Sequence, residues 1–309
     1  MQESYYSFNR YLQEKFGQRV QRISLDAGFD CPNLDGTKSS EGCIYCNNKG
    51  FSKFSRQKVD LKKQITDSMA FYQKRLGVEK FIAYFQAFSN TYAGLKTLKE
   101  RYEVIKRFPQ IVGLFISTRP DCVDEEKIKL IAAYAENYLV WMEYGLQTTQ
   151  NDILNAINRN HTYEDFLKAL ALTRKYNLNV GAHLIFGLPG WSSRQFAEDI
   201  KRLTKLDIQG VKMHVLHVLR GTTLESEYQK GNLKLFSQAD YVKIACDFLE
   251  RIPPQWVILR LVSDAAHDYL IAPEWINNKA AVIEAIRQEL ARRKSFQGCY
   301  YEGSRFQNH

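Results

Sequence analysis

Residues 30–48 read DCPNLDGTKSSEGCIYCNN and place Cys31, Cys43 and Cys46 in the spacing C-x11-C-x2-C. The other three cysteines stand far apart, at positions 122, 246 and 299. Three clustered cysteines beside three isolated ones indicate a metal site rather than a disulfide framework. The Gly, Ser and Asp residues between them predict a loop that wraps a metal group, so that three thiolates converge.

The number of ligands separates the possible kinds of metal site. A structural zinc ion prefers four protein ligands, and the histidine nearest in sequence is His161. A redox-active C-x-x-C pair has no need of Cys31. In a [4Fe–4S] cluster, three thiolates bind three irons and leave the fourth iron open to another ligand. The cysteines alone favour this cluster and leave zinc as the alternative.

Strand-like and helical segments alternate on both sides of the cysteine loop. The strand-like runs are 20–26, 80–88, 111–117, 138–146, 180–186, 211–218 and 257–261. The helical runs are 60–76, 94–107, 124–136, 151–157, 164–176, 193–204, 237–250 and 279–294. This alternation predicts an α/β fold with a parallel sheet, and its six or seven units favour a partial (β/α)6 TIM-like barrel. We expect a core barrel over 18–270, an N-terminal extension over 1–17 and a C-terminal helical extension over 271–309.

Charge and hydropathy indicate which partners and which cellular compartment to expect for the chain. The 309 residues carry a net charge of +9, and residues 49–80 hold nine Lys/Arg against three Asp/Glu. Uneven basic charge favours a polyanionic partner, nucleic acid above all, although many proteins are this basic without one. An 18-residue apolar run and a signal-peptide pattern are both missing, so we expect a cytoplasmic protein without a membrane span.

Further motifs follow the cysteine loop in order. They are FQAFSNTY at 85–92, STRPD at 117–121, EYGLQT at 143–148, NRNHT at 158–162, FGLPG at 186–190 and KMH at 212–214. With LDAGFDCPN at 25–33 and GCIYC at 42–46, they make a chain that resembles the radical S-adenosylmethionine (SAM) superfamily. More narrowly, it resembles the YhcC/YtqA-like family, which is related to the radical domain of the Elongator catalytic subunit.

The resemblance implies a partial radical SAM barrel and its cofactors. Cys31, Cys43 and Cys46 are expected to hold a [4Fe–4S] cluster, and SAM is expected to bind the open iron. One electron then cleaves SAM and produces a 5′-deoxyadenosyl radical. A flavodoxin- or ferredoxin-type protein is the implied electron donor.

The resemblance also suggests which residues contact SAM. Tyr45 precedes the last cysteine, where the superfamily places an aromatic ring against the adenine. The turn that usually reads Gly-Gly-Glu and holds the methionine amino group differs here, and Gln86, Ser89 and Asn90 offer the hydrogen bonds. Which of these three makes the contact is left open.

Residues at the ends of later strands complete the expected SAM site. Ser117 follows the third strand, and Gln147 is a candidate contact for the ribose or the carboxylate. Gly187 and Leu188 are assigned to the adenine side, because glycine lets a planar ligand approach the backbone. The alternative for these positions is an ordinary turn between a strand and a helix.

Four polar residues are candidates for catalysis or substrate binding. Glu143 stands in an apolar strand, and a ribose or a substrate amine would satisfy it if it points inward. Lys212 and His214 alternate onto one face of a strand and could bind a carboxylate, unless that face is partly exposed. Arg119 follows the third strand and contacts cofactor or substrate, unless it is a surface arginine in a turn. His183 is expected to be a packed barrel residue.

The resemblance to the Elongator radical domain points to transfer RNA as substrate. It implies conversion of carboxymethylaminomethyl uridine at the wobble position to aminomethyl uridine. Two alternatives stay open: a radical SAM enzyme acting on a small metabolite or peptide, and a zinc-stabilised RNA-binding protein without enzymatic activity.

Overall fold

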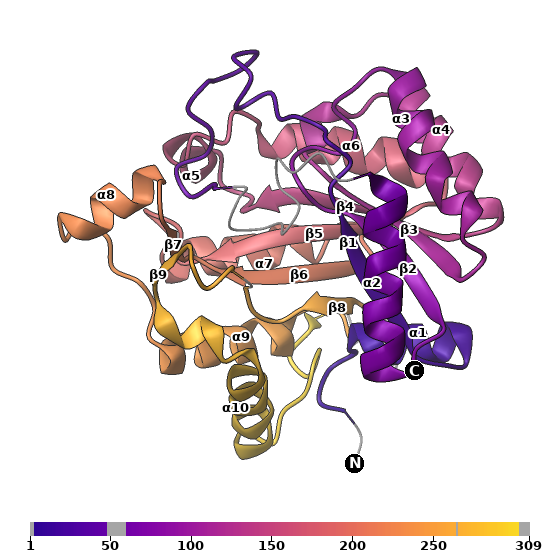
Figure 1. Ribbon diagram of the computed structural model, residues 1–309. Coiled ribbons are helices and arrows are strands. Elements are labelled where there is room, and N and C mark those ends of the chain that lie inside the picture. Colours follow the sequence, from indigo (N-terminus) through magenta and orange to yellow (C-terminus); the bar gives the residue numbers. More distant parts are fainter. Residues whose placement is uncertain (1–2, 48–59, 264, 303–309) are drawn as a thin grey trace.

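Seven parallel strands form the central sheet in a computed structural model that describes residues 3–47, 60–263 and 265–302. The strands lie in the order β1-β2-β3-β4-β5-β6-β8, and the sheet curls into a half-barrel (Figure 1). Their bounds are β1 Val20–Leu25, β2 Lys80–Phe85, β3 Ile111–Thr118, β4 Leu139–Gln147, β5 Asn179–Phe186, β6 Gly210–Val215 and β8 Val257–Arg260. The expected partial α/β barrel is confirmed, and β8 extends its six strands at one edge.

Helices connect the strands and cover the outer face of the sheet (Figure 1). The helices between strands are α2 Leu61–Leu76, α3 Leu95–Tyr102, α4 Glu125–Ala132, α5 Asn151–Ala156, α6 Tyr163–Lys175, α7 Ser193–Leu203, α8 Thr223–Gln229 and α9 Gln238–Arg251. Local signals set their ends. The Asp60 side chain caps α2, a capping box of Thr162 and Asp165 starts α6, and Gly77 ends α2 in the left-handed conformation.

Two further α-helices and a small two-stranded sheet lie outside this alternation of central strands and connecting helices. They are α1 Phe8–Phe16, α10 Lys279–Arg292, and the antiparallel pair β7 Val218–Leu219 and β9 Leu270–Ala272. The run expected as one strand over 211–218 is therefore two strands in different sheets. The strand expected over 80–88 ends at Phe85, and Phe88 adopts a positive φ of 62° where the chain turns away from the sheet.

The two faces of the sheet pack into different apolar clusters. Phe81, Ala83 and Phe85 of β2 pack with the covering helices, whereas Ile82 and Tyr84 belong to a second cluster inside the curl. This is the period-two alternation of a strand. Buried hydrophobic residues thus hold the helices outside the sheet and fill the amino-terminal half of its interior.

The interior becomes polar toward the carboxyl ends of the strands. On β4, Trp141 lies in the inner apolar cluster, and two residues later the fully buried position is Glu143. On β6, Lys212 and His214 line a cavity. The polar half of the interior therefore opens at the end where barrel enzymes carry their active sites.

Helix α1 closes the opposite, apolar end of the half-barrel (Figure 1). Its Leu12 is 1% exposed, and Phe8 and Tyr11 make edge contacts with Phe115 and Trp141 at ring-centroid distances of 5.7 Å. The segment before α1 pairs with β8, whose Ile258 N–H donates to the carbonyl of residue 6 at 2.9 Å. The N-terminal segment is thus part of the sheet edge and of the inner core.

Truncating Leu12 should destabilise the fold measurably. Leu12→Ala removes buried methyl groups under the half-barrel, and we expect the free energy of unfolding to fall by about 2–5 kcal/mol. Anaerobic urea unfolding measures the effect. Gln13→Ala, at the exposed neighbouring position, is the control and should change stability by less than about 0.5 kcal/mol. Equal effects of the two substitutions would contradict the described packing of α1.

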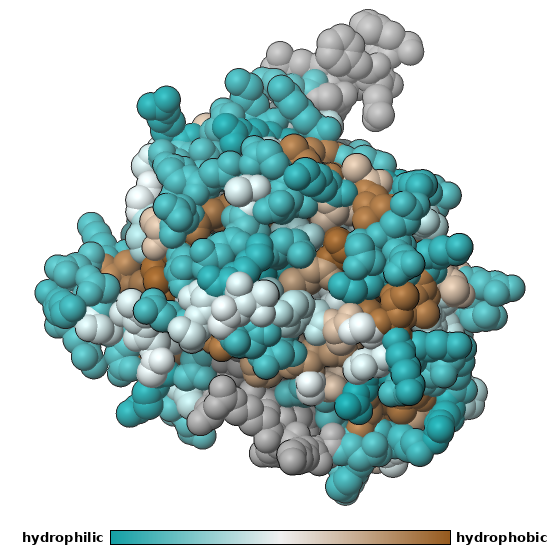
Figure 2. Space-filling view, turned by 90° about the horizontal axis from the view of Figure 1, so that it is seen from above, coloured by the Kyte–Doolittle hydropathy of each residue, from teal (hydrophilic) through white to brown (hydrophobic). Residues whose placement is uncertain are grey.

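The molecular surface seen from above is mostly hydrophilic, with apolar side chains in separate patches (Figure 2). Within the described ranges, the structure contains no helix long and apolar enough to cross a membrane. Part of the basic stretch at 49–80, from 49 to 59, lies outside the described residues.

Candidate active site

Two adjoining cavities occupy the polar end of the half-barrel. The cysteine cavity, of about 630 Å³ including space open to solvent, is lined by Cys31, Cys43 and Cys46. The strand cavity, of about 750 Å³ on the same measure, is lined by residues of β2, β5 and β6. Five residues line both: Tyr45, Phe88, Ser117, Gln147 and His183. A molecule bound between the cavities would therefore contact the thiols and the strand residues together.

The described part of the cysteine loop, residues 26–47, follows β1 and brings the three thiols to one cavity. Cys43 is buried and the other two are partly buried. Burial, followed by the neighbouring Cys43 and Cys31, raises the pKa of the Cys46 thiol, so a thiolate at this position needs positive charge nearby. Within the described residues, no three His, Cys, Asp or Glu side chains are placed to hold a single metal ion.

The donor set fits a four-iron cluster. Such a cluster takes one thiolate on each of three separate irons, so its ligands surround a cavity rather than meet at one ion. The three thiols around the cysteine cavity have this arrangement, and His183, the one histidine among the described residues that line it, is hydrogen-bonded to Glu143 at 2.6 Å. The spacing in sequence and the placement in space thus agree.

Several buried polar atoms at the two cavities have no hydrogen-bond partner in the described protein. They are the Tyr45 hydroxyl, Ser89 Oγ, Arg119 Nη1 and His214 Nε2, all on residues that line the cavities. Asn90 Oδ1 is also unpartnered, and its amide donates to the Ser117 carbonyl at 2.8 Å. An unsatisfied buried polar group costs about 1–3 kcal/mol, so these atoms indicate a polar ligand.

The residues expected to contact SAM are partly gathered here. Gln86, which accepts a hydrogen bond from Ser24 at 3.2 Å, lines the strand cavity, and Gln147 turns into both cavities with a φ of 76°. Positive φ at a non-glycine residue is uncommon and clusters at functional sites. Ser117 lies between Gln86 and Gln147 along the sheet order, on β3.

Gly187 and Leu188, which are expected on the adenine side, do not line either cavity. Gly187 has a φ of 86°, and a Cβ there would lie 2.8 Å from the ring of Phe236. The glycine thus leaves room for the ring of Phe236. Leu188 belongs to an apolar cluster against which Tyr45 of the cysteine loop packs.

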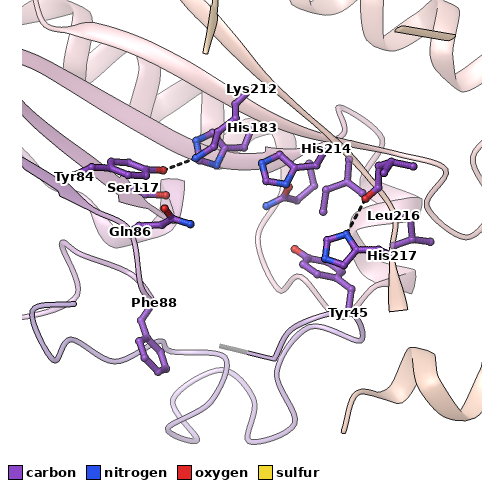
Figure 3. Close-up of a pocket in the computed structure, with 13 residues that line it drawn as sticks. Tyr45, Tyr84, Gln86, Phe88, Ser117, His183, Lys212, His214, Leu216 and His217 are labelled. Atoms are coloured by element: carbon purple, nitrogen blue, oxygen red, sulfur yellow. Dashed lines mark hydrogen bonds between the residues drawn. The ribbon is translucent and has the colours of Figure 1, made fainter. Parts of the chain in front are cut away.

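A buried ionic network forms the floor of the strand cavity. Glu143 accepts hydrogen bonds from His183 at 2.6 Å, Tyr84 at 2.9 Å, Lys212 at 3.2 Å and Arg22 at 3.4 Å. Lys212 Nζ also donates to the Tyr84 hydroxyl at 2.5 Å. In Figure 3, Tyr84, His183, Lys212 and His214 lie along the strands, whereas Tyr45 and Phe88 come from loops on the opposite side.

The network changes the role expected of Glu143. Its carboxylate is not among the groups that line the cavities, because the side chains of Lys212, His183 and Tyr84 stand between. Its partners are the protein's own side chains: the cations Lys212 and Arg22, the phenol of Tyr84 and the imidazole of His183. Glu143 therefore positions Lys212 and His183, and these two face the cavity. His183 is a member of the site and not only a packed barrel residue.

Arg119 is buried, so it is not the surface arginine that was the alternative. Its guanidinium, 2% exposed, makes two hydrogen bonds of 2.9 Å to Asp121, and Nη1 faces the cysteine cavity. Arg119 therefore lines the cysteine cavity and does not line the strand cavity with Lys212 and His214. Lys212 and His214 do lie together, two residues apart on β6, and the His214 ring stacks on His183 at 5.9 Å.

Burial shifts the pKa values of the network in directions that favour paired or neutral groups. Burial raises the pKa of Glu143, but the charge of Lys212 and the contact with His183 outweigh it and hold that pKa well below its usual value. Burial, with Arg260 and Lys212 as lesser causes, holds the pKa of His214 well below normal. Burial, followed by the charge of Lys212, lowers the pKa of His183 to about 4.

The lowered pKa of His183 predicts acid sensitivity. Between pH 6.5 and 4 the unfolded chain binds a proton on His183 that the native state does not, so stability falls as the pH falls. The expected slope from this residue is about 1.4 kcal/mol per pH unit, levelling off below pH 4. Urea unfolding of wild type and His183→Gln at pH 7 and 5 measures it. Identical slopes in the two proteins would contradict the assignment.

Comparison with known proteins places the chain in a family. A model described as the radical SAM superfamily matches residues 37–203, and one described as the radical SAM C-terminal domain matches residues 208–292. The chain is 38% identical to the uncharacterized protein YtqA of Bacillus subtilis, covering 97% of this chain and 94% of that protein. It is 32% identical to protein YhcC of Escherichia coli, covering 88% and 87%.

More distant similarities agree with the fold. The chain is 30% identical to the tRNA uridine(34) acetyltransferase of Methanocaldococcus jannaschii over 47% of this chain and 27% of that protein. The archaeal Elp3 of Methanocaldococcus infernus superposes with a TM-score of 0.62 at 18% identity, covering 90% of this chain and 64% of that chain. The chain belongs to the radical SAM superfamily, with YtqA and YhcC among its relatives, and is an enzyme that uses a [4Fe–4S] cluster and SAM.

Proposed function

We propose that this enzyme modifies the wobble uridine of transfer RNA, converting its carboxymethylaminomethyl group to an aminomethyl group. The observation that carries the proposal is the strand cavity beside the cysteine cavity. There Lys212 Nζ and the unpartnered Nε2 of His214 offer donors suited to a carboxylate. The substrate's carboxylate and the carbon to be attacked are only one bond apart, so a site that holds the first presents the second.

Two further observations favour transfer RNA as the carrier of that group. The chain has a net charge of +9, which suits the phosphate backbone. Part of the chain is similar to tRNA uridine(34) acetyltransferases of archaea and of Dehalococcoides mccartyi, and to human Elongator complex protein 3. Because a base inside a folded RNA is out of reach, the uridine must be presented unstacked to the cavity.

In this proposal, different residues of the chain hold the cluster and contact SAM. Cys31, Cys43 and Cys46 hold the cluster, which when bound supplies the electron that cleaves SAM and so produces the radical. Tyr45, which lines both cavities, offers its ring to the adenine in this proposal. A flavodoxin- or ferredoxin-type protein is the electron donor in this proposal.

The polar turn after β2 and the strand ends orient SAM in the proposed complex. Ser89 Oγ offers a hydrogen bond to the methionine amino group, and the backbone turn that Asn90 holds keeps it in place. Gln86, Ser117 and Gln147 offer polar groups to the ribose and carboxylate.

The ionic network prepares the carboxylate site. Glu143 and Tyr84 hold Lys212 Nζ by hydrogen bonds. Burial lowers the pKa of both Lys212 and His214, so a bound carboxylate compensates the cost of keeping a proton there.

The atoms of the reaction balance. The methylene between nitrogen and carboxylate loses one hydrogen atom, one electron and one proton, which leaves a carbon–nitrogen double bond. Water adds to that bond, and the carbon–nitrogen bond breaks to give the aminomethyl uridine and glyoxylate. SAM would take up two electrons, one from the cluster and one in the hydrogen atom, and end as methionine and 5′-deoxyadenosine. The electron released when the double bond forms would restore the one that the cluster supplied.

Nucleoside analysis tests the proposal. Reconstituted enzyme, SAM, a chemical reductant and transfer RNA carrying the carboxymethylaminomethyl group should yield aminomethyl uridine and an equal amount of glyoxylate. Lys212→Met should raise the KM for this RNA. An unchanged wobble base while SAM is cleaved would contradict the proposal. If RNA binding is also absent at low salt, a small metabolite or peptide becomes the substrate class to test.

A further inference from the structure

The turn after α5, residues 158–160, forms hydrogen bonds with the cysteine loop. Asn158 and Asn160 adopt left-handed backbone conformations, with φ of 52° and 53°, and so reverse the chain on either side of Arg159. Asn158 Nδ2 donates to the Gly42 carbonyl at 2.6 Å, and Lys38 Nζ donates to the Asn160 carbonyl at 2.9 Å. The turn is thus fastened to the cysteine loop and directs Arg159 toward it.

Arg159 is buried against the thiol of Cys43. It is 8% exposed, and Nη1 donates to Cys43 Sγ at 3.5 Å. Nη2 donates to the Gly145 carbonyl at 2.8 Å, and Nε donates to His161 Nε2 at 2.9 Å. Both bonds fix the plane of the guanidinium, because they hold two of its three nitrogens.

The positive charge of Arg159 has no carboxylate partner. In the part of the chain that the structure describes, Arg159 forms an ion pair with neither an aspartate nor a glutamate. His161 stays neutral, because burial and then the charge of Arg159 lower its pKa to about 3. Its Nε2 accepts the hydrogen bond from Arg159, and its Nδ1 faces the carbonyl of Thr162 at 3.2 Å. The thiolates are therefore the negative charges that can compensate this buried cation.

Asn33 provides a second donor to the same sulfur. Its Nδ2 lies 3.5 Å from Cys43 Sγ and 2.6 Å from the Asn158 carbonyl, and its Oδ1 accepts from Asn160 Nδ2 at 3.1 Å. The side chain is 1% exposed and cannot turn away without losing these bonds. Cys43 is thus approached by two N–H donors, one of them charged.

We propose that Arg159, assisted by Asn33, raises the reduction potential of the cluster through Cys43. Reduction adds one negative charge to the cluster, and a nearby buried cation and N–H donors stabilise the more negative state more strongly. Hydrogen bonds from outside the ligand set tune metal sites in this way. Arg159 is a positioning residue in this proposal: it acts on the electron that enters the site and makes no contact with the substrate.

A redox titration of the full-length, anaerobically reconstituted protein tests the proposal without SAM or RNA. Iron and sulfide are counted first, and the reduced cluster is followed by electron paramagnetic resonance. We expect Arg159→Met to lower the midpoint potential by at least the 59 mV that corresponds to a tenfold change for one electron. Arg159→Lys keeps the charge and should lie closer to wild type.

Two further variants separate the charge from the hydrogen bonds. Asn33→Ala should shift the potential in the same direction by a smaller amount, with no change in net charge. Arg174→Met removes the same charge from a surface ion pair with Asp207 and should leave the potential unchanged.

A wild-type potential in both Arg159→Met and Asn33→Ala, with four irons bound, would overturn the proposal. If Arg159→Met binds no iron, the test rests on Asn33→Ala. A wild-type midpoint potential in Asn33→Ala then overturns the proposal. Because RNA takes no part in the titration, failure of the transfer RNA proposal leaves this result unaffected.

Discussion

Cys43→Ala loses the cluster and with it the cleavage of SAM. Cys43 is the most buried of the three thiols that line the cysteine cavity, and a cluster with two protein ligands is not held. We expect anaerobically reconstituted wild type to be brown with about four irons per chain, and the variant to be nearly colourless. The amount of 5′-deoxyadenosine formed with dithionite should fall to background.

Cys299→Ala is the matched control for this loss. Cys299 is also a free, partly buried cysteine, but it does not line the cysteine cavity. The control should keep both iron and 5′-deoxyadenosine formation. Full iron content in Cys43→Ala, or loss of iron in both variants, would contradict the assignment of the cysteine loop.

Lys212→Met produces the largest expected loss of stability in the strand cavity. The fully buried Glu143 loses one of its cationic partners, and breaking a buried ion pair from one side typically costs about 3–5 kcal/mol. We expect a loss near the lower end of this range, because Tyr84, His183 and Arg22 still donate hydrogen bonds to Glu143. Anaerobic urea unfolding at pH 7 measures the loss.

A double-mutant cycle distinguishes an uncompensated charge from poor packing. In the Glu143→Gln background the buried negative charge is gone, so Lys212→Met should cost at least about 1 kcal/mol less there. Lys230→Met breaks a surface pair with Glu227 and should cost at most about 1 kcal/mol. Additive effects of the two buried substitutions would contradict the described network.

Strand positions and inward-facing polar residues could be predicted from the sequence, because both follow from local periodicity. Alternation placed Lys212 and His214 on one face of β6, and an apolar context marked Glu143 as exceptional. Their partners could not be predicted. Register between β4, β5 and β6 sets which inward side chains meet, and a one-residue slip would separate Glu143 from His183 and Lys212.

Helix α1 and the role of Arg159 could not be predicted from the sequence, for two different physical reasons. Helix α1 has nine residues, too few for a stable isolated helix, and it forms because Leu12 and its aromatic neighbours pack under the sheet. Arg159 lies 116 residues from Cys43 in a turn without periodicity. The sequence signal that could have marked it is the pair of asparagines on either side, since asparagine is enriched in left-handed turns.

The most direct test of the account follows one hydrogen atom from substrate to cofactor. A synthetic anticodon stem-loop carries carboxymethylaminomethyl uridine with both hydrogens between nitrogen and carboxylate replaced by deuterium. If the strand cavity presents that carbon to the radical formed at the cysteine cavity, the 5′-deoxyadenosine gains one mass unit as aminomethyl uridine appears. Product formation with unlabelled 5′-deoxyadenosine, or SAM cleavage without product, would contradict the central claim.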